Sequence, residues 1–238
     1  MADKIFRVNM SDLTAAVEDV PVEWMGLGGR GLTSTVVAAE VEPTCHPLGG
    51  HNKLVIAPGL LSGTPAANSG RLSCGAKSPL TGTIKEANAG GSSAQMLARL
   101  GVKAIIIEGK PKTDGWYSLR VSSGGVAISE ESELIGKGNY ELIQTLNDQL
   151  GEKYGVISIG PAGEMKMAGA NISIKDPGSR IRSSGRGGLG AVMGSKKIKY
   201  IAIEPTENKV DIAKPEEFKA ANRTFAKALV DNPISKAL

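Results

Sequence analysis

The run Ser179-Arg-Ile-Arg-Ser-Ser-Gly-Arg-Gly-Gly-Leu-Gly-Ala-Val-Met-Gly-Ser-Lys-Lys-Ile-Lys199 decides how this chain is interpreted. Five glycines, three arginines and three lysines fall within these 21 residues. Glycine lets a backbone approach a ligand closely or turn with positive φ. The planar donor fork of arginine fits the oxygens of a phosphate group. The run therefore predicts a binding site for a phosphorylated cofactor.

Two common nucleotide motifs do not fit this run. The segment Gly188-Leu-Gly-Ala-Val-Met-Gly194 is one residue too long for the dinucleotide pattern GxGxxG, and residues 180–184 before it are too polar for a buried strand. The segment 190–196 lacks the four-residue spacer of a P-loop. The sequence thus argues against a Rossmann or P-loop nucleotide site.

Composition narrows the possible partners and compartments. The chain has 238 residues, is 41% hydrophobic and carries a formal charge of only +4, so it can bury a sizeable core. Aromatic residues make up 4%, too few for base-stacking surfaces, and we expect no nucleic-acid partner. No stretch approaches the roughly 20 apolar residues of a membrane span, and the N-terminus has no signal-peptide core. We expect a cytoplasmic protein without a membrane partner.

The cysteines and histidines predict no catalytic or metal centre of their own. Cys45 and Cys74 lack CxxC spacing and are too few for a zinc or iron–sulfur site, so we expect both to be buried free thiols. His46 and His51 lie in a Pro/Gly-rich loop without a Gly-x-Ser-x-Gly nucleophile motif. We expect surface histidines rather than a catalytic base.

Apolar runs and glycine clusters alternate along the chain, which favours ligand loops on an α+β scaffold. We expect sheet and helix to pack as two layers. The predicted strands are 5–9, 53–57, 104–108, 117–121, 156–159 and 198–203, and the predicted helices are 32–40, 93–100, 140–150 and 215–230. Val55-Ile-Ala-Pro-Gly59 and Val156-Ile-Ser-Ile-Gly-Pro161 share a strand-then-glycine form, a hint of two similar halves.

Three segments carry a resemblance to a known family. They are Asn52-Lys-Leu-Val-Ile-Ala-Pro-Gly-Leu-Leu-Ser-Gly-Thr64, Gly70-Arg-Leu-Ser-Cys-Gly-Ala-Lys-Ser-Pro-Leu-Thr-Gly-Thr-Ile-Lys-Glu-Ala-Asn-Ala-Gly-Gly91 and Gly185-Arg-Gly-Gly-Leu-Gly-Ala-Val-Met-Gly-Ser-Lys196. In order and spacing they resemble the N-terminal domain of the tungsten-containing aldehyde:ferredoxin oxidoreductases, and the likeness extends from residue 4 to about residue 205. It implies two β-sheets with flanking helices that form a base for a bis-pterin cofactor.

In that family two pyranopterin-dithiolene groups share one tungsten or molybdenum, and Mg²⁺ joins their phosphates. By resemblance, Arg71 and Arg182 pair with the phosphates. The side chain or carbonyl of Asn88 and the carbonyl of Ser183 face the Mg²⁺ or its waters, an ion that prefers oxygen ligands. Gly90 and Gly185 allow close backbone approach, and Arg186 is a further cofactor-binding candidate.

Plainer interpretations stand beside these roles. Arg71 can be a surface residue after a turn, and Asn88 a left-handed turn residue. Arg186 can equally clamp its loop to backbone carbonyls. The segment Gly28-Gly-Arg-Gly31 can be a simple helix entry, although the resemblance favours a cofactor role for Arg30. We expect Lys196, Lys197 and Lys199 only to solvate the start of a strand.

The resemblance also implies what this chain does not carry. We expect residues 1–208 to be the pterin-binding domain and residues 209–238 the start of a helical domain that is truncated or supplied by a partner. The parent enzyme oxidises aldehydes, or related oxo-acids, to carboxylic acids and passes electrons to ferredoxin through a [4Fe–4S] cluster. That cluster belongs to the missing C-terminal domain or to a cluster-bearing subunit. The alternative is a non-catalytic scaffold or cofactor-storage subunit, and a homo-oligomer is left open.

Overall fold

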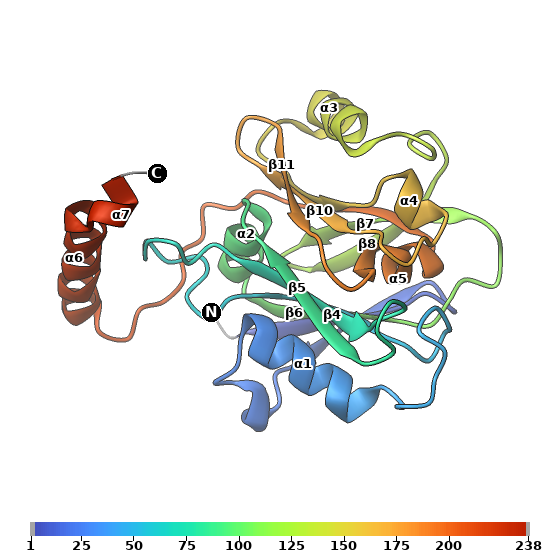
Figure 1. Ribbon diagram of the computed structural model, residues 1–238, viewed down its shortest axis with the longest axis horizontal. Helices are drawn as coiled ribbons and strands as arrows, with labels where there is room; N and C mark the ends of the chain where they lie inside the picture. The colour runs from blue at the N-terminus through green and yellow to red at the C-terminus, as the bar shows by residue number, and fades with distance from the viewer. Residues whose placement is uncertain (1–2, 237–238) are drawn as a thin grey trace.

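The computed structural model describes residues 3–236, whose strands form two six-stranded sheets (Figure 1). The first sheet has the order β2-β1-β6-β3-β4-β5 and the second the order β11-β10-β9-β12-β7-β8. The strands of the first sheet are β1 (Lys4–Asn9), β2 (Thr14–Asp19), β3 (Leu54–Pro58), β4 (Leu72–Lys77), β5 (Ile84–Ala89) and β6 (Val102–Glu108). The strands of the second are β7 (Trp116–Ser122), β8 (Gly125–Glu131), β9 (Gly155–Ser158), β10 (Ile172–Asp176), β11 (Arg180–Ser184) and β12 (Ile198–Ile203).

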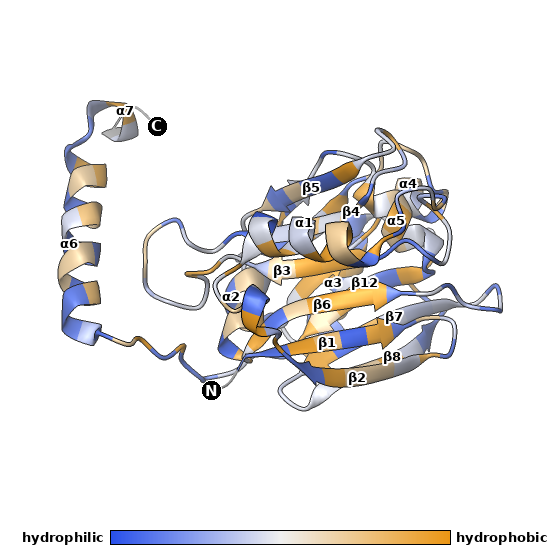
Figure 2. Cartoon of the chain, turned by 90° about the horizontal axis from the view of Figure 1, so that it is seen from below, coloured by the Kyte–Doolittle hydropathy of each residue, from blue (hydrophilic) through white to orange (hydrophobic). Residues whose placement is uncertain are grey.

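Alternation of side chains along the strands divides the core into layers. Phe6, Ile105 and Ile107 join an apolar cluster between the two sheets that also takes in residues of β7, β9 and β12. Ile5 and Ile106 point the other way and pack under helix α1 (Gly29–Glu40). Helix α3 (Asn139–Leu150) covers the outer face of the second sheet in the same manner. The expected two-layer packing is therefore wrong: the order is helix, sheet, sheet, helix, because both sheets are apolar on both faces. Figure 2 shows β3 and β6 hydrophobic along most of their length.

Two short helices close opposite ends of the inter-sheet core (Figure 1). Helix α2 (Ser93–Arg99) contributes Ala94 and Leu97 to that core, and helix α5 (Leu189–Ser195) contributes Leu189, Val192 and Met193. The edge strands meet as well, β5 beside β11 and β2 beside β8. The sandwich thus has a seam between β5 and β11, each followed by a glycine loop and a buried helix.

The two halves of the chain have the same topology. Each runs hairpin, helix, three-stranded meander, helix and a last strand that pairs in parallel with the first. The registers agree residue by residue. Ser73 lies opposite Asn88, and Ser173 lies opposite Ser183. The two segments that hinted at similar halves, 55–59 and 156–161, begin in the equivalent strands β3 and β9.

An irregularity in the pairing of the last strand is repeated too. The register of β6 against β1 skips Lys103, and that of β12 against β7 skips Lys199. Each lysine is buried and donates to a carbonyl shortly before the first helix of its own half: Lys103 to Met25 at 2.9 Å and Lys199 to Lys137 at 2.9 Å. Bulges of this kind re-aim a side chain, and here both re-aim a cation onto a loop.

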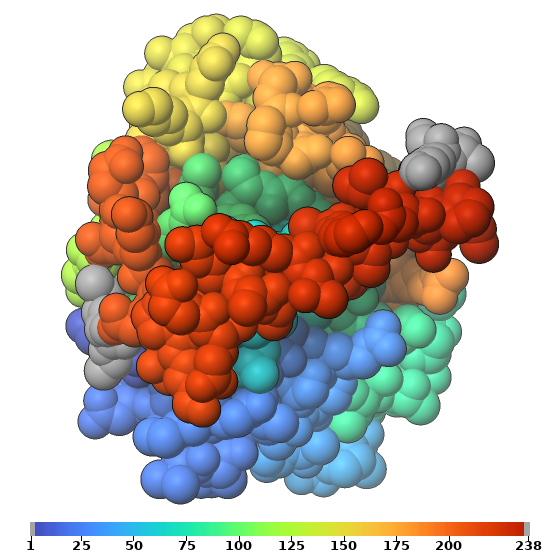
Figure 3. Space-filling view, turned by 90° about the vertical axis from the view of Figure 1, so that its left-hand side faces the viewer, coloured from blue at the N-terminus to red at the C-terminus, as the bar shows by residue number. Residues whose placement is uncertain are grey.

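The remaining elements are the 3₁₀ helix η1 (Val22–Trp24), α4 (Pro161–Glu164), α6 (Pro215–Asp231) and α7 (Pro233–Lys236). Helix α6 lies beside the sandwich rather than in its layers, as Figures 1 and 3 show, and none of its residues is buried. No helix within residues 3–236 has the length and apolar character needed to cross a membrane.

All six predicted strands and all four predicted helices are confirmed to within a few residues. Residues 180–184 are not a buried strand, as their polarity indicated, but they do form the mostly exposed strand β11. A strand, a glycine loop and a helix do follow one another here. However, β11 is an antiparallel edge strand, so the arrangement is not the parallel βαβ unit of a dinucleotide fold.

Candidate functional site

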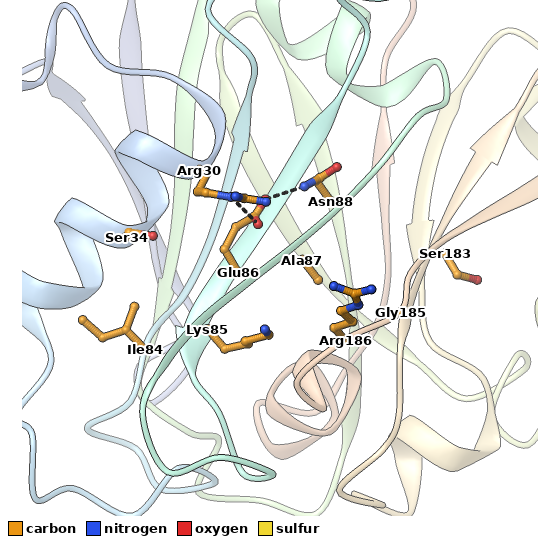
Figure 4. Close-up of a pocket in the computed structure, with 10 residues that line it drawn as sticks. All are labelled: Arg30, Ser34, Ile84, Lys85, Glu86, Ala87, Asn88, Ser183, Gly185 and Arg186. Carbon is orange, nitrogen blue, oxygen red and sulfur yellow. Dashed lines mark hydrogen bonds and ion pairs between the residues drawn. The ribbon is translucent and has the colours of Figure 1, made fainter. Parts of the chain in front are cut away.

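A pocket of about 690 Å³ lies at the seam where β5 and β11 meet. The start of α1, strand β5, the end of β11 and the following loop line it (Figure 4). The lining residues are Arg30, Ser34, Ile84, Lys85, Glu86, Ala87, Asn88, Ser183, Gly185 and Arg186. Four predicted cofactor residues, Asn88, Ser183, Gly185 and Arg186, are thus brought together, although 95 or more positions separate Asn88 from the others.

Asn88 and Ser183 occupy equivalent positions in the two halves. Each lies opposite a serine on the neighbouring strand, as the registers of β5 and β11 show. By the same count Gly90 is equivalent to Gly185, two residues further along each chain segment. The Ser183 hydroxyl is directed away from β5 (Figure 4), which leaves its backbone as the part that faces the seam. A ligand with two similar ends would meet similar backbone on both sides.

Gly90 and Gly185 differ from the other glycines of their loops. A Cβ added at either would meet no atom within 4 Å, so each presents bare backbone to open space. In contrast, a side chain on Gly188, Gly190 or Gly194 would collide with a backbone carbonyl of the second half. Only part of the glycine run therefore faces the site, and the rest allows α5 to pack tightly.

Arg71 is tied to Asn88 at the edge of this pocket. Its Nε donates to Asn88 Oδ1 at 2.7 Å, and its Nη2 approaches the Asn88 carbonyl at 3.4 Å. Asn88 lies within strand β5 and has no positive φ, so the turn interpretation of this residue is wrong. Arg71 is an exposed residue, but its guanidinium is oriented by a specific partner.

Glu86 lies beneath this pair and was not singled out from the sequence. Its side chain is only 5% exposed. Oε1 accepts from Ser73 Oγ at 2.7 Å and from Asn88 Nδ2 at 3.0 Å, and Oε2 accepts from Arg30 Nε at 3.0 Å. The alternation of a strand places residues 84, 86 and 88 on one face, a signal that becomes visible only once 84–89 is known to be a strand.

Arginines reach the pocket from both halves. Arg30, at the start of α1, and Arg186, in the loop after β11, extend toward β5 from opposite sides (Figure 4). Within the described residues the Arg186 guanidinium donates no hydrogen bond, so the expectation that it clamps its own loop has no support. Arg182 is exposed on β11, outside the pocket lining, where its Nε pairs with Asp176 at 3.0 Å. The site thus offers several guanidinium groups around one seam.

This donor set fits the phosphates that the sequence implied. Guanidinium groups and open backbone at two glycines are what a pair of phosphate groups requires. The Asn88 side chain is engaged at both ends, by Arg71 and by Glu86, so its carbonyl is the better candidate to face Mg²⁺. Within residues 3–236, no three His, Cys, Asp or Glu side chains gather to hold a metal ion directly.

Comparison with known proteins agrees with this geometry. The family model described as the N-terminal domain of aldehyde ferredoxin oxidoreductase matches residues 5–205. The chain belongs to this family. The tungsten-containing aldehyde ferredoxin oxidoreductases of Pyrococcus furiosus and Thermococcus kodakarensis are 38% and 37% identical to it, each over 98% of this chain and 38% of the relative. The chain therefore spans little more than a third of the length of these relatives.

A solved structure shares the fold. It is the active-site complex BamBC of benzoyl coenzyme A reductase with 1,5-dienoyl-CoA, with a TM-score of 0.87 and 29% identity over 95% of this chain and 34% of that chain. The WOR-like subunit of an aliphatic sulfonate oxidoreductase from Pyrococcus furiosus is 29% identical over 85% of this chain. This chain covers about a third of the length of each of these two proteins.

In this aldehyde ferredoxin oxidoreductase N-terminal domain, the lysines after the glycine run do not solvate a strand, and that prediction is wrong. Lys196 and Lys199 have fully buried side chains. Lys196 Nζ donates to the Asn52 carbonyl at 2.6 Å and the Gly109 carbonyl at 3.0 Å, while Lys199 pairs with Glu164. Lys197 is half-buried, lies over the Trp116 ring and pairs with Asp114. Lys196 and Lys199 cross-link the domain because buried carbonyl or carboxylate partners replace water around them, whereas the partner of Lys197 is exposed.

The cysteines and histidines of this domain take no part in the site. Burial raises the pKa of the Cys74 thiol to about 12, so it is an inert buried thiol as expected. Cys45 is also a free thiol, but it is only half-buried, so the expectation that both cysteines are buried is wrong for Cys45. Its side chain packs against the apolar cluster under helix α1. His46 and His51 are exposed, which confirms them as surface residues.

Proposed function

We propose that this chain is the pterin-binding part of an aldehyde-oxidising, or related oxo-acid-oxidising, enzyme that passes electrons to ferredoxin. The observation that supports this most directly is that Asn88 and Ser183, and likewise Gly90 and Gly185, occupy equivalent positions on the two sides of one seam. Two pterin phosphates bridged by Mg²⁺ present two similar anionic ends, and the seam offers two similar backbone segments flanked by arginines.

In this proposal Arg71 binds the phosphate of one pterin and Arg182 that of the other. Arg182 exchanges its present partner, Asp176, for the phosphate or holds both. The carbonyls of Asn88 and Ser183 face the bridging Mg²⁺ or its waters, Gly90 and Gly185 admit the cofactor to the backbone, and Arg186 adds a donor from the second half. The bound tungsten or molybdenum centre supplies the oxygen-transfer chemistry, and this chain binds and orients it.

The remaining parts of the enzyme lie outside this chain's residues. We assign the [4Fe–4S] cluster to a C-terminal domain or a cluster-bearing subunit, and we place the enzyme in the cytoplasm. Helix α6 supports such a contact, because it buries none of its residues and exposes Phe225 and Val230 on its surface. Exposed apolar groups on an isolated helix are typical of a surface that another element covers. The boundary between residues 208 and 209 stays a prediction.

The decisive experiment is metal, pterin and phosphate analysis of the full-length protein purified without air. We expect close to one tungsten or molybdenum and two pterins per chain, with one Mg²⁺. The double variant Arg71→Ala with Arg182→Ala should lose most of the pterin. Arg120→Ala removes an exposed, paired arginine of β7 remote from the seam and should keep it.

Two results would contradict the proposal. Wild-type protein free of metal, pterin and phosphate would exclude a pterin site. Full pterin retention in the double variant would show that the arginines are assigned wrongly. Pterin bound without aldehyde oxidation in the complete enzyme would instead favour the scaffold or storage role.

A further inference from the structure

We propose that Glu86 is the positioning residue of this site: it holds Asn88, and through it Arg71, in the orientation that receives one phosphate. The inference rests on the proposed function, because it assigns to the same pocket a residue that touches no ligand itself. Glu86 is a carboxylate buried beside a site for anions, a place where a negative charge opposes binding unless it organises cations.

The hydrogen bonds run in one direction only. A carboxylate oxygen accepts hydrogen bonds. Glu86 Oε1 therefore faces the amide nitrogen of Asn88, and Nδ2 donates to it at 3.0 Å. The Asn88 amide is thereby turned so that Oδ1 faces the solvent side and accepts from Arg71 Nε at 2.7 Å. Without Glu86, either end of the amide could face Arg71, and one of those orientations would present a donor to a donor.

Glu86 is itself fixed by two further contacts. Ser73 Oγ donates to Oε1 at 2.7 Å, and Arg30 Nε donates to Oε2 at 3.0 Å. The carboxylate therefore sets the direction of Arg30 as well, whose guanidinium extends over the pocket (Figure 4). One buried group thus orients an amide and two guanidinium groups that come from α1, the start of β4 and β5.

The second half of the domain shows that the fold does not need a carboxylate here. Glu86 lies opposite Gly75, and Ile181 lies opposite Lys175, so Ile181 is the equivalent residue. Ile181 packs against the apolar cluster under α3. The same strand position thus holds an isoleucine in one half and, in the other, a glutamate that accepts three hydrogen bonds. This difference points to a role of Glu86 in the site. It also makes the half containing Arg71 the preorganised one.

The test uses the full-length, cofactor-loaded protein and the isosteric variant Glu86→Gln. The matched control is Glu204→Gln, which changes a carboxylate paired with Arg120 at 2.8 Å, away from the seam. Three quantities are measured: pterin and metal per chain, the rate of pterin release after dilution into EDTA, and the melting temperature. Asn88→Ser, which copies Ser183, frees Arg71 while leaving Glu86 in place, and serves if Glu86→Gln does not fold.

We expect Glu86→Gln to release pterin about 10- to 100-fold faster, the range typical of a disturbed supporting partner. Its amide has one acceptor oxygen where the carboxylate has two, so it cannot hold Asn88 and Arg30 at the same time. The control should behave as wild type. Added to Arg71→Ala, Glu86→Gln should produce little further acceleration of pterin release, since both changes weaken the same contact between Asn88 and Arg71. A purely structural role would instead lower the melting temperature and act additively with Arg71→Ala.

The outcomes separate this inference from the function on which it rests. A wild-type protein that carries pterin, together with a Glu86→Gln variant that releases it at the wild-type rate, overturns the role of Glu86 alone. The role of Glu86 is also overturned if the two accelerations of pterin release multiply in the double variant Arg71→Ala with Glu86→Gln. A wild-type protein without pterin or phosphate overturns both proposals.

Discussion

Lys196 donates from Nζ to the carbonyl of Asn52, 2.6 Å away, and so joins the last turn of the second half's helix α5 to the entry of strand β3 in the first half. A second bond to the Gly109 carbonyl, at 3.0 Å, ties the exit of β6 to the same amino group. One buried amino group therefore holds three segments that are 57 or more residues apart in sequence. It joins the two halves at the end of the sandwich that α5 closes.

Lys196→Met should destabilise the domain. Methionine can fill the space of the lysine stem, but it leaves the two carbonyls without their donor, and a buried unpaired acceptor costs about 1–3 kcal/mol. We expect a decrease of this size per carbonyl in the free energy of unfolding, measured by urea denaturation at pH 9, where Lys196 in the folded protein is an uncharged amine that still donates to both carbonyls. Lys112→Met, an exposed lysine with an exposed partner, is the control and should change stability by less than about 0.5 kcal/mol. An unchanged midpoint for Lys196→Met would contradict the cross-linking role.

The same lysine predicts a dependence of stability on pH. Burial lowers the Lys196 pKa in the folded state to about 7, from 10.5 in the unfolded chain. Between these values the unfolded chain binds a proton that the folded protein has lost, so folding stability rises with pH. The slope is at most about 1.4 kcal/mol per pH unit. The difference in unfolding free energy between wild type and Lys196→Met should therefore widen between pH 7 and pH 9.5. A constant difference would show that Lys196 does not titrate in this range.

Sequence patterns found the strands with clear apolar runs and missed others, among them the buried strands β4 and β10, whose small and polar residues interrupt the pattern. Strands such as 104–108 are buried on both faces, so they appear as continuous apolar runs. The edge strands β5 and β11 need no apolar surface on their outer sides, and some of their polar residues, such as Asn88 and Ser183, line the pocket instead. The helix α5 was missed for another reason. Glycine disfavours helices, but here Gly190 and Gly194 permit packing against backbone that any side chain would prevent.

The candidate site was predictable only in part. The resemblance to a family supplied Arg71, Asn88 and Ser183, and the structure brings Asn88 and Ser183 to one pocket and places Arg71 beside it. Glu86 and Asp176 were not found, because the sequence does not show which polar residues on unrecognised edge strands face the same side. The buried lysines were misjudged for a related reason: three cations in four positions look solvated until the bulge at Lys199 is known.

Alanine substitutions at two glycines of the run 179–199 should affect different properties of the protein, pterin binding in one case and stability in the other. Gly185 has no neighbour within 4 Å of an added Cβ, whereas a Cβ on Gly190 would collide with the Asn171 carbonyl. Gly185→Ala should therefore keep the melting temperature within about 2 °C but reduce pterin content, because the methyl group fills space that the cofactor needs. Gly190→Ala should lower the melting temperature by several degrees, through overpacking of about 1–3 kcal/mol. Thermal denaturation combined with pterin analysis separates the two effects, and equal behaviour of the variants would contradict this division of the run.

The equivalent lysines Lys103 and Lys199 should differ in how much their loss costs. Lys103 donates to the Met25 carbonyl and lies 3.6 Å from the exposed Asp3 carboxylate. Lys199 is paired with Glu164, whose side chain is only 11% exposed. Removing Lys199 alone would leave that carboxylate buried without its counter-ion, which typically costs about 3–5 kcal/mol. We expect Lys199→Met to be clearly more destabilising than Lys103→Met in urea denaturation.

Glu164 supplies the check on this comparison, because it also accepts from the Gly136 backbone N–H through both of its oxygens, at 3.1 and 3.0 Å. Glu164→Gln should retain an acceptor for that N–H while removing the charge. The double variant Lys199→Met with Glu164→Gln should therefore recover part of the stability that Lys199→Met loses, a positive coupling that a double-mutant cycle measures. Strictly additive losses would mean that the bulge at Lys199 stabilises the domain through packing of the lysine stem, and that the ion pair contributes nothing beyond it.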